Sequence, residues 1–408
     1  MKGGFSLIKD IFFDQVKPAY GCTEPIAVAL STATAKKYLN ETLEDLKEIN
    51  ITLDKNTYKN GLVVNIPGTN IFGLEIAAAL GYLCGIPEKG LEVLKDVNSQ
   101  CLSKATNLKN KIKIEINDMP YLYVETIAVS KDNHTVKILI EGKHDNIAKI
   151  TIDSNTILDK PFNPSKTTLE NIKKYSIDEI IDYVENPDKE VLDYVEKAIE
   201  MNIDIAKYGM QMKGNFSNAA INEYVKYVSA GVDARMSGVL KPVMTVAGSG
   251  NQGLSCILPI ATKREEYDKE KILKATLLSI LVTIYIKAYT GLLTPICGAG
   301  SISAAGSAAG LTYLKGGNRQ QIKNAINDTI GTLFGLTCDG AKRGCALKAV
   351  TGTLTAIQVS ELAINNIDVP CGNGIVAKDV EETIRRVGKL TNSVKQFDKD
   401  VLDYIGKC

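Results

Sequence analysis

The sequence predicts an α+β protein, with a small N-terminal domain that contains an antiparallel sheet and a predominantly helical C-terminal domain. Residues 111–155 form four short runs in which apolar and polar side chains alternate, which is typical of an antiparallel meander. From Ser176 onward, long apolar runs are separated by Gly-rich breaks, and this pattern favours packed helices. The stretch 160–185, rich in Pro, Asn, Lys and Asp, separates the two patterns. We therefore predict an α+β domain over residues 1–165 and a mainly helical domain over residues 176–408.

The elements of the first domain follow from local signals. Residues 5–20 have a helical pattern and lead into the loop GCTEP, where Pro25 suits the first turn of a second helix. Residues 50–70 predict two strands around a turn at 59–61. A helix rich in small residues then follows directly over 71–85.

Composition excludes several classes of function. The net charge of +1 gives no sign of a nucleic-acid or membrane-surface partner. The apolar run 276–293 is interrupted by Lys287, so we expect a buried helix and no membrane span. The N-terminus carries acids within its apolar stretch and is unlike a signal peptide, so we expect a cytoplasmic protein. Only two histidines are present, and both His134 and His144 have charged neighbours, so we expect them at the surface and no His-based triad.

Three cysteines in Gly-rich turns, Cys297, Cys338 and Cys345, carry the main functional signal. Forty residues separate the first two and six separate the last two, which does not fit paired CxxC zinc knuckles. Two loops joined by a helical hairpin could bring the three thiolates around one iron–sulfur cluster and leave one iron open. Lys342 and Arg343 lie between the last two cysteines and would favour thiolates. The alternative is that all three are small buried core residues.

The remaining cysteines are open to several interpretations. Cys22 stands just before a predicted helix N-terminus, where a thiolate is stabilised, and it could act as an acid/base group, as a transient sulfur carrier or as a cluster ligand. It could equally pack beside a helix cap. Cys371 lies in a Gly-Pro turn and is an alternative ligand, and the terminal Cys408 could reach an open iron or simply fray. In a reducing cytosol we expect few disulfides, and we expect Cys84, Cys101 and Cys256 to be core residues.

Two Gly-containing loops are candidates for binding a substrate carboxylate or ammonium group. The loop AGSGNQG follows an apolar run and precedes an apolar helix, so its N–H groups and polar side chains could hold an anion. The loop PGTN has the same strand–turn–helix context. Either could be an ordinary turn, and neither has the spacing of a dinucleotide or nucleoside-triphosphate loop. The candidate residues are Thr69, Asn70, Ser249, Gly250, Asn251 and Gln252.

Five motifs in order along the chain, GCTEPIAVAL, VNIPGTN, AGSGNQG, PICGAG and TCDGAKRGC, resemble those of the L-cysteine desulfidase family. These are lyases that use an iron–sulfur cluster and no pyridoxal phosphate, and their wider relatives are the iron–sulfur L-serine dehydratases. The resemblance implies conversion of L-cysteine to pyruvate, ammonia and hydrogen sulfide. It implies a 4Fe-4S cluster held by Cys297, Cys338 and Cys345 in the helical domain, with Cys22 as a functional fourth cysteine. A terminal cysteine that caps the cluster resembles a device of some serine dehydratases, which suggests such a role for Cys408.

The expected chemistry is a β-elimination on a small amino acid, in which an open iron acts as a Lewis acid toward the substrate sulfur. The base that takes the Cα proton cannot be a surface histidine. Cys22 is the first candidate, and Lys342, Lys348 and Glu24 are the reserves. Three other interpretations remain: an iron–sulfur serine dehydratase, a protein with a structural metal site, and a helical domain with core cysteines. The Gly/Ala-rich helices also allow close packing between two copies, as in a homodimer.

Overall fold

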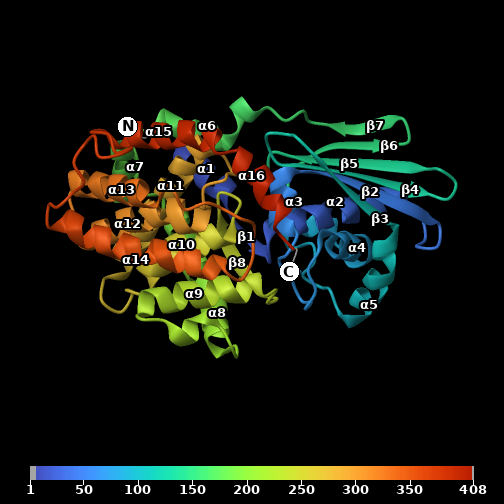
Figure 1. Cartoon of the computed structure of the whole chain (residues 1–408), viewed down its shortest axis with the longest axis horizontal. Coiled ribbons are helices and arrows are strands. Elements are labelled where there is room, and N and C mark those ends of the chain that lie inside the picture. Colours follow the sequence, from blue (N-terminus) through green and yellow to red (C-terminus); the bar gives the residue numbers. More distant parts are fainter. Residues whose placement is uncertain (1–5, 407–408) are drawn as a thin grey trace.

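The computed structural model describes residues 6–406 and has the α+β fold that the sequence predicts (Figure 1). The strands are β1 (Val16–Tyr20), β2 (Leu46–Asp54), β3 (Ile112–Asn117), β4 (Tyr123–Ser130), β5 (Thr135–Glu141), β6 (Ile147–Ile152), β7 (Asn155–Asp159) and β8 (Pro242–Val246). The first helices are α1 (Ser6–Gln15), α2 (Thr23–Leu39), α3 (Lys55–Gly61), α4 (Leu74–Cys84), α5 (Ser99–Leu108), α6 (Thr168–Asn171), α7 (Ile177–Glu185) and α8 (Lys189–Gln211). The others are α9 (Glu223–Met236), α10 (Gly250–Ala261), α11 (Lys269–Thr290), α12 (Ser303–Leu314), α13 (Arg319–Leu333), α14 (Cys345–Ile364), α15 (Val380–Ser393) and α16 (Gln396–Asp400). Cys408 lies outside the described residues.

A six-stranded sheet forms one side of the molecule, in the order β3-β2-β4-β5-β6-β7. Strands β4 to β7 are the antiparallel meander that alternation predicts, because their buried and partly exposed residues alternate along each strand. Strand β3 was expected in the same meander but pairs in parallel with β2 instead. Helix α2 packs against β4 and β5, and α4 packs on α2, so small-residue helices cover one face of the sheet (Figure 1).

A second, two-stranded sheet joins the N-terminus to the helical part. Strand β1 pairs antiparallel with β8, with Val16 opposite Val246 and Tyr20 opposite Pro242. The predicted helix over 5–20 is therefore wrong after Gln15, because Pro18 cannot continue a helix and β8 offers an edge to pair with. Buried side chains of α1 belong to the large helical core, and the sheet with α2 and α4 has a core of its own. The division into two sequence-defined domains stays a prediction.

The second of the two strands predicted around residues 59–61 is also wrong. Strand β2 ends at Asp54, and helix α3 follows. The Asp54 side chain accepts hydrogen bonds from the backbone N–H groups of Asn56 and Thr57, so it caps the helix. The stretch thus has the composition of a strand but begins with a strong helix cap.

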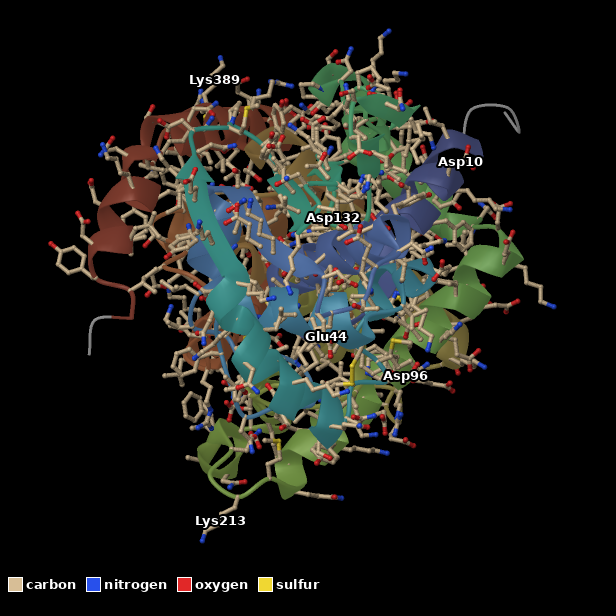
Figure 2. The ribbon with its side chains drawn as sticks, turned by 90° about the vertical axis from the view of Figure 1, so that its right-hand side faces the viewer. Asp10, Glu44, Asp96, Asp132, Lys213 and Lys389 are labelled. Carbon is tan, nitrogen blue, oxygen red and sulfur yellow. A yellow bond between two sulfur atoms is a disulfide. The ribbon has the colours of Figure 1, made fainter. Side chains whose placement is uncertain are left out.

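Helix α11 is the core helix that the apolar run predicts. Among residues 6–406 it alone has the length and composition to cross a membrane, and 89% of its most apolar window is buried inside the protein. Neighbours on several sides account for this burial, with α12, α10 and α15 packed around it. In Figure 2, the labelled charged residues lie on the face toward the viewer or near the edge of the view, and they are Asp10, Glu44, Asp96, Asp132, Lys213 and Lys389.

Cys84 and Cys101 form a disulfide that joins the end of α4 to α5. The expectation of two separate core thiols is wrong at these positions, because the chain returns on itself between the two helices and brings both side chains together. Cys256 is a free, fully buried core thiol on α10, as expected, and Cys371 is exposed.

Candidate active site

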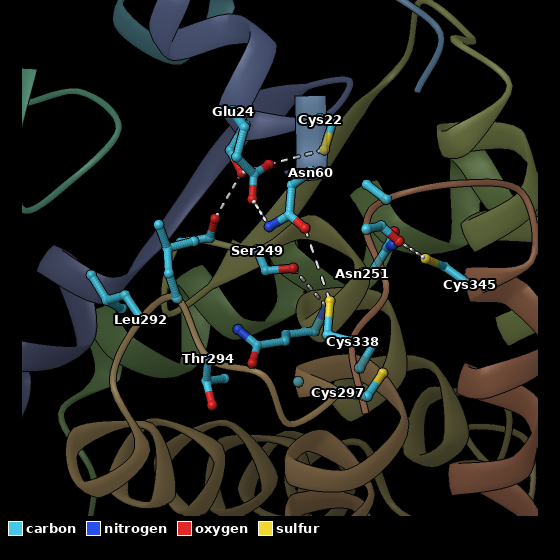
Figure 3. Close-up of a pocket in the computed structure, with 18 of the residues that line it drawn as sticks. Cys22, Glu24, Asn60, Ser249, Asn251, Leu292, Thr294, Cys297, Cys338 and Cys345 are labelled. Atoms are coloured by element: carbon cyan, nitrogen blue, oxygen red, sulfur yellow. Dashed lines mark hydrogen bonds between the residues drawn. The ribbon is translucent and has the colours of Figure 1, made fainter. Parts of the chain in front are cut away.

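A cavity lies where the two cores meet (Figure 3). The sheet side supplies the N-terminus of α2, the end of α3 and the loop between β5 and β6. The helical side supplies α9, α10, α11 and the two cysteine loops. The polar and cysteine residues of its wall that matter below are Cys22, Glu24, Asn60, His144, Arg235, Ser249, Asn251, Gln252, Lys287, Cys297, Cys338 and Cys345.

The two cysteine loops lie side by side and are tied by backbone hydrogen bonds. The Cys297 N–H donates to the carbonyl of Leu336 at 2.8 Å, and the Cys338 N–H donates to the carbonyl of Pro295 at 2.7 Å. The Cys297 sulfur accepts a bond from the Gly300 N–H at 3.3 Å, in the π-helical turn that starts α12. Cys345 is the first residue of α14. The structure thus brings the three predicted ligands to one cavity from two separate loops.

The thiols of Cys297 and Cys345 resist ionisation unless a positive charge lies nearby. Burial, and then the neighbouring Cys338 and Cys345, raise the pKa of Cys297 to about 12. Burial, and then Cys338, also raise the pKa of Cys345, although Lys342 opposes the rise. Several buried thiolates in one cavity repel each other, so their ionisation needs a cation such as a metal centre to offset it.

The chemistry of the three loop cysteines is that of iron–sulfur ligands, because thiolates are the usual protein ligands of such clusters. Among residues 6–406, no three His, Cys, Asp or Glu side chains converge closely enough to ligate one metal ion. In a cubic cluster, however, each thiolate ligates a different iron, so the three sulfurs need to face one space and need not meet at a point. Three cysteines around one cavity, with no fourth cysteine from these loops, fit a cluster that keeps one corner for another ligand.

Cys22 and Glu24 form a hydrogen-bonded pair at the start of α2. The Cys22 thiol donates to Oε2 of Glu24 at 3.0 Å, and Asn60 Nδ2 donates to Oε1 at 2.8 Å. Burial, and then the charge of Glu24, raise the pKa of Cys22 well above its usual range. Desolvation and the carboxylate thus oppose the thiolate that the helix N-terminus would favour.

Glu24 itself is ionised. Burial opposes its charge, but the nearby His144 and the hydrogen bonds from Cys22 and Asn60 outweigh burial and lower its pKa. Asn60 extends this network across the cavity, because its Oδ1 accepts a long contact of 3.9 Å from the Cys338 thiol. The Cys22–Glu24 pair is thus connected to the cysteine loops through one amide side chain.

His144 is buried in the cavity wall, and the expectation of a surface residue is wrong. Its side chain is 4% exposed, and its Nε2 lies 4.0 Å from Oε1 of Glu24 without a hydrogen-bond partner in the described residues. Burial lowers the pKa of His144, although Glu24 and Asp145 oppose this effect. Charged neighbours misled the sequence interpretation, since the loop between β5 and β6 turns its histidine inward onto α2 and Gly248.

The loop AGSGNQG reaches the cavity, and PGTN does not. Ser249 caps α10, and its Oγ accepts from the Gln252 N–H at 3.4 Å. Asn251 and Gln252 also line the cavity, while Gly250 supplies the first turn of the helix. Thr69 donates instead to the carbonyl of Ile66 at 2.9 Å, within its own turn. The structure therefore does not place Thr69 and Asn70 with the other predicted residues.

The reserve bases and one missed lysine differ in their surroundings. Lys342 and Lys348 both form ion pairs with Asp339, and neither lines the cavity. Lys287 does line it, and its Nζ donates to the carbonyl of Leu292 at 2.8 Å. Burial lowers the pKa of Lys287 to about 7, against the effect of Cys338, Cys297 and Glu24. A single lysine within an apolar helix was the signal that could have identified it.

Comparison with known proteins decides the family. Residues 88–403 match the serine dehydratase alpha chain family, which is more than three quarters of the chain. The chain belongs to the serine dehydratase alpha chain family. Membership indicates a lyase of the iron–sulfur serine dehydratase type. All three loop cysteines lie within the matched residues 88–403. The residues Cys22, Glu24 and Asn60 precede the matched region.

Several relatives match the chain over most of its length. A UPF0597 protein of Thermosipho melanesiensis is 75% identical over 98% of this chain and 100% of its own length. A UPF0597 protein of Fervidobacterium nodosum is 53% identical over 99% of this chain and 97% of its own length. One from Clostridium perfringens is 40% identical over 95% of this chain and 95% of its own length. These proteins therefore extend beyond the family match to include the segment with Cys22 and Glu24.

Proposed function

We propose that this member of the family is an L-cysteine desulfidase, which converts L-cysteine to pyruvate, ammonia and hydrogen sulfide with a 4Fe-4S cluster held by Cys297, Cys338 and Cys345. The observation that carries the proposal is that these three thiols and the Cys22–Glu24 pair face the same cavity. The motif resemblance described above supports cysteine as the substrate. When bound, a cluster with one open iron supplies a Lewis acid for the substrate sulfur.

The residues of this chain would handle the proton and hold the substrate. In the reaction the Cα–H and Cβ–S bonds break, a double bond forms between Cα and Cβ, and water then releases ammonia from the imine to give pyruvate. We propose that the Cys22–Glu24 pair accepts the Cα proton, with the Cys22 thiol held against the carboxylate by its hydrogen bond. Ser249, Gly250, Asn251 and Gln252 would bind the polar groups of the substrate at the first turn of α10.

Serine dehydration is the second candidate, because the family match itself favours it. The same cavity would then act on a Cβ–O bond, with the proton chemistry unchanged. Anaerobically reconstituted protein, assayed with L-cysteine and L-serine side by side, separates the two. We expect a higher kcat/KM for L-cysteine, and dominant turnover of L-serine would overturn the desulfidase assignment.

Iron and sulfide analysis of single variants tests the roles of the cysteines. We expect Cys297→Ala, Cys338→Ala and Cys345→Ala each to lose the cluster, and Cys22→Ala to keep it without turnover. Cys371→Ala is the matched control, because Cys371 is exposed outside the cavity. A full cluster in all three loop variants would contradict the ligand assignment, and loss of the cluster in Cys22→Ala would make Cys22 a ligand.

A further inference from the structure

Arg235 is a buried cation without a counterion in the wall of the cavity. It lies in the last turn of α9, and its side chain is 2% exposed. Nη1 donates to Oδ1 of Asn251 at 2.9 Å, but Nε and Nη2 have no hydrogen-bond partner among residues 6–406. A buried charge with two unpaired donors is costly, and folded proteins seldom keep one without a use.

A second arginine nearby shows what a paired guanidinium looks like here. Arg343 binds Asp233, also on α9, through two bonds, Nε to Oδ1 at 2.7 Å and Nη2 to Oδ2 at 2.8 Å. Asp233 is fully buried, and Arg343 binds both of its carboxylate oxygens, so this acid is not available to Arg235. The equivalent Nε–Nη2 edge of Arg235 has the same geometry and no acid, and that edge matches a carboxylate in bidentate fashion.

The N-terminus of α10 adds a second positive feature at the same place. A Cβ atom at Gly250 would lie 2.4 Å from Nε of Arg235 and 2.7 Å from its Cζ, so only glycine lets the guanidinium rest against this turn. The first N–H groups of α10 have no partner within the helix, and the helix dipole makes this end positive. A guanidinium and a helix N-terminus that lie side by side both favour a negatively charged ligand at the same place.

We infer that Arg235, together with the first turn of α10, is the receptor for the α-carboxylate of the substrate, and thereby limits the substrates to those with a free carboxylate. This inference rests on the proposed lyase function and names the group that selects its substrates. It holds equally for L-cysteine and L-serine, because both carry the same carboxylate. The charge of Arg235 also acts on Cys22 and His144 across the cavity, which places the receptor beside the groups that handle the proton.

The experiment compares ligands with and without a carboxylate on the reconstituted holoprotein. L-Alanine and ethylamine are used as competitive inhibitors, because neither has a leaving group and they differ only in the carboxylate. In the wild type we expect L-alanine to bind on the order of 100-fold more tightly than ethylamine. In Arg235→Met we expect both to bind equally weakly, and kcat/KM for the amino-acid substrate to fall by a similar factor. The preference of Arg235→Lys for L-alanine should lie between those of the wild type and Arg235→Met. Lysine keeps the positive charge but lacks the two parallel N–H donors of the guanidinium.

Thermal unfolding separates a receptor from a structural residue. Without ligand, Arg235→Met should unfold at the same temperature as the wild type or higher, because it removes an unpaired buried charge. The matched control Arg343→Met should unfold at a lower temperature, because it leaves Asp233 buried without its partner. L-Alanine should raise the midpoint of the wild type and leave that of Arg235→Met unchanged.

The possible failures are distinct. If the wild type turns over amino acids but Arg235→Met still prefers L-alanine over ethylamine, the carboxylate receptor is overturned and the lyase function stands. A ligand-free Arg235→Met that unfolds well below the wild type would also overturn it, in favour of a structural role. If the wild type neither binds L-alanine nor turns over L-cysteine or L-serine, the proposed function is overturned, and the inference with it.

Discussion

At the scale of single residues, the cavity is built from buried charges whose partners are few. Glu24 is buried, and His144 together with the hydrogen bonds from Cys22 and Asn60 outweighs desolvation and lowers its pKa. Lys287 lies in the same wall and has a pKa of about 7, so it can change its charge near neutral pH. Sites that move protons need such groups, since their pKa values must lie near the working pH.

Substitution of Glu24 by glutamine tests whether the carboxylate takes part in accepting the Cα proton. The amide would keep the size of the side chain and a hydrogen-bond acceptor, but it could not take a proton. We expect kcat to fall by roughly 100-fold or more, with the iron content unchanged. Glu170→Gln is the control, because Glu170 pairs with Lys173 outside the cavity. Unchanged turnover in Glu24→Gln would exclude the carboxylate from the proton path.

Asp328 on α13 gives a pH-dependent effect on stability away from the cavity. Burial raises its pKa to about 6, although the Val369 N–H donates to it. A raised carboxyl pKa means that the folded state binds the proton more tightly, so stability falls as pH rises from about 4 to about 6. Asp328→Asn should therefore raise the free energy of unfolding by about 1–2 kcal/mol near pH 8, after allowance for screening.

The gain from Asp328→Asn should shrink to roughly half a kcal/mol near pH 4, where the wild-type carboxyl is protonated in the folded state and about half protonated in the unfolded state. Urea unfolding of the two proteins at both pH values measures it. An equal gain at both pH values would mean that the amide acts through packing and that the charge of Asp328 is not the cause.

At the scale of elements, glycines set how closely the segments that carry Cys297 and Cys345 approach each other. A Cβ atom at Gly352 on α14 would lie 2.3 Å from the carbonyl oxygen of Gly300, in the turn after Cys297. Helix α14 begins with Cys345, so this contact fixes the position of one thiol relative to another. Small residues in helices therefore control the geometry of the cavity without lining it.

Gly352→Ala should push α14 away from the Cys297 turn and loosen the three-thiol arrangement. We expect a reconstituted protein with reduced iron content and faster loss of iron to a chelator, although all thiols are present. Gly335→Ala is the matched control, because a Cβ atom there would meet nothing within 4 Å. Equal iron retention in both variants would show that the close approach of α14 does not govern cluster binding.

Sequence patterns predicted the parts of this site that depend on local signals. Gly-rich turns marked Cys297, Cys338, Cys345 and the start of α10, because loops between apolar helices are recognisable from composition. His144 and Arg235 were missed because nothing local distinguishes a charged loop or helix residue that turns inward from one that faces water. Their burial depends on which distant elements pack together, as when the β5–β6 loop meets α2.

The turn predicted at residues 59–61, with a strand on either side, shows the same limit for the fold. Local propensity suggested a β-hairpin, and the Asp54 cap together with tertiary contacts decided for helix α3 instead. The disulfide between Cys84 and Cys101 was likewise invisible, because pairing requires knowledge of how α4 and α5 return on each other. Long, strongly patterned segments such as α11 and the β4–β7 meander were predictable because their periodicity extends over many residues.

At the scale of the whole molecule, the C-terminal helix α16 contacts helix α3, whose Asn60 lines the cavity. Helix α16 lies next to α3 (Figure 1), and Lys59 forms an ion pair with Asp398 in which both side chains are almost fully buried. Lys59 also donates to the carbonyl of Cys338 at 3.1 Å. One lysine therefore ties the N-terminal part, the C-terminal helix and a cluster loop together.

Lys59→Met should lower the free energy of unfolding by about 3–5 kcal/mol, because it leaves the Asp398 carboxylate buried and unpaired. The double variant Lys59→Met/Asp398→Leu removes both charges, so most of this stability should return. The bond to the Cys338 carbonyl is missing in both variants, and both should therefore release iron faster than the wild type. Denaturant unfolding and chelator kinetics on the same samples separate the two effects. Wild-type iron release in the stable double variant would mean that Lys59 acts only through its ion pair and does not hold the Cys338 loop.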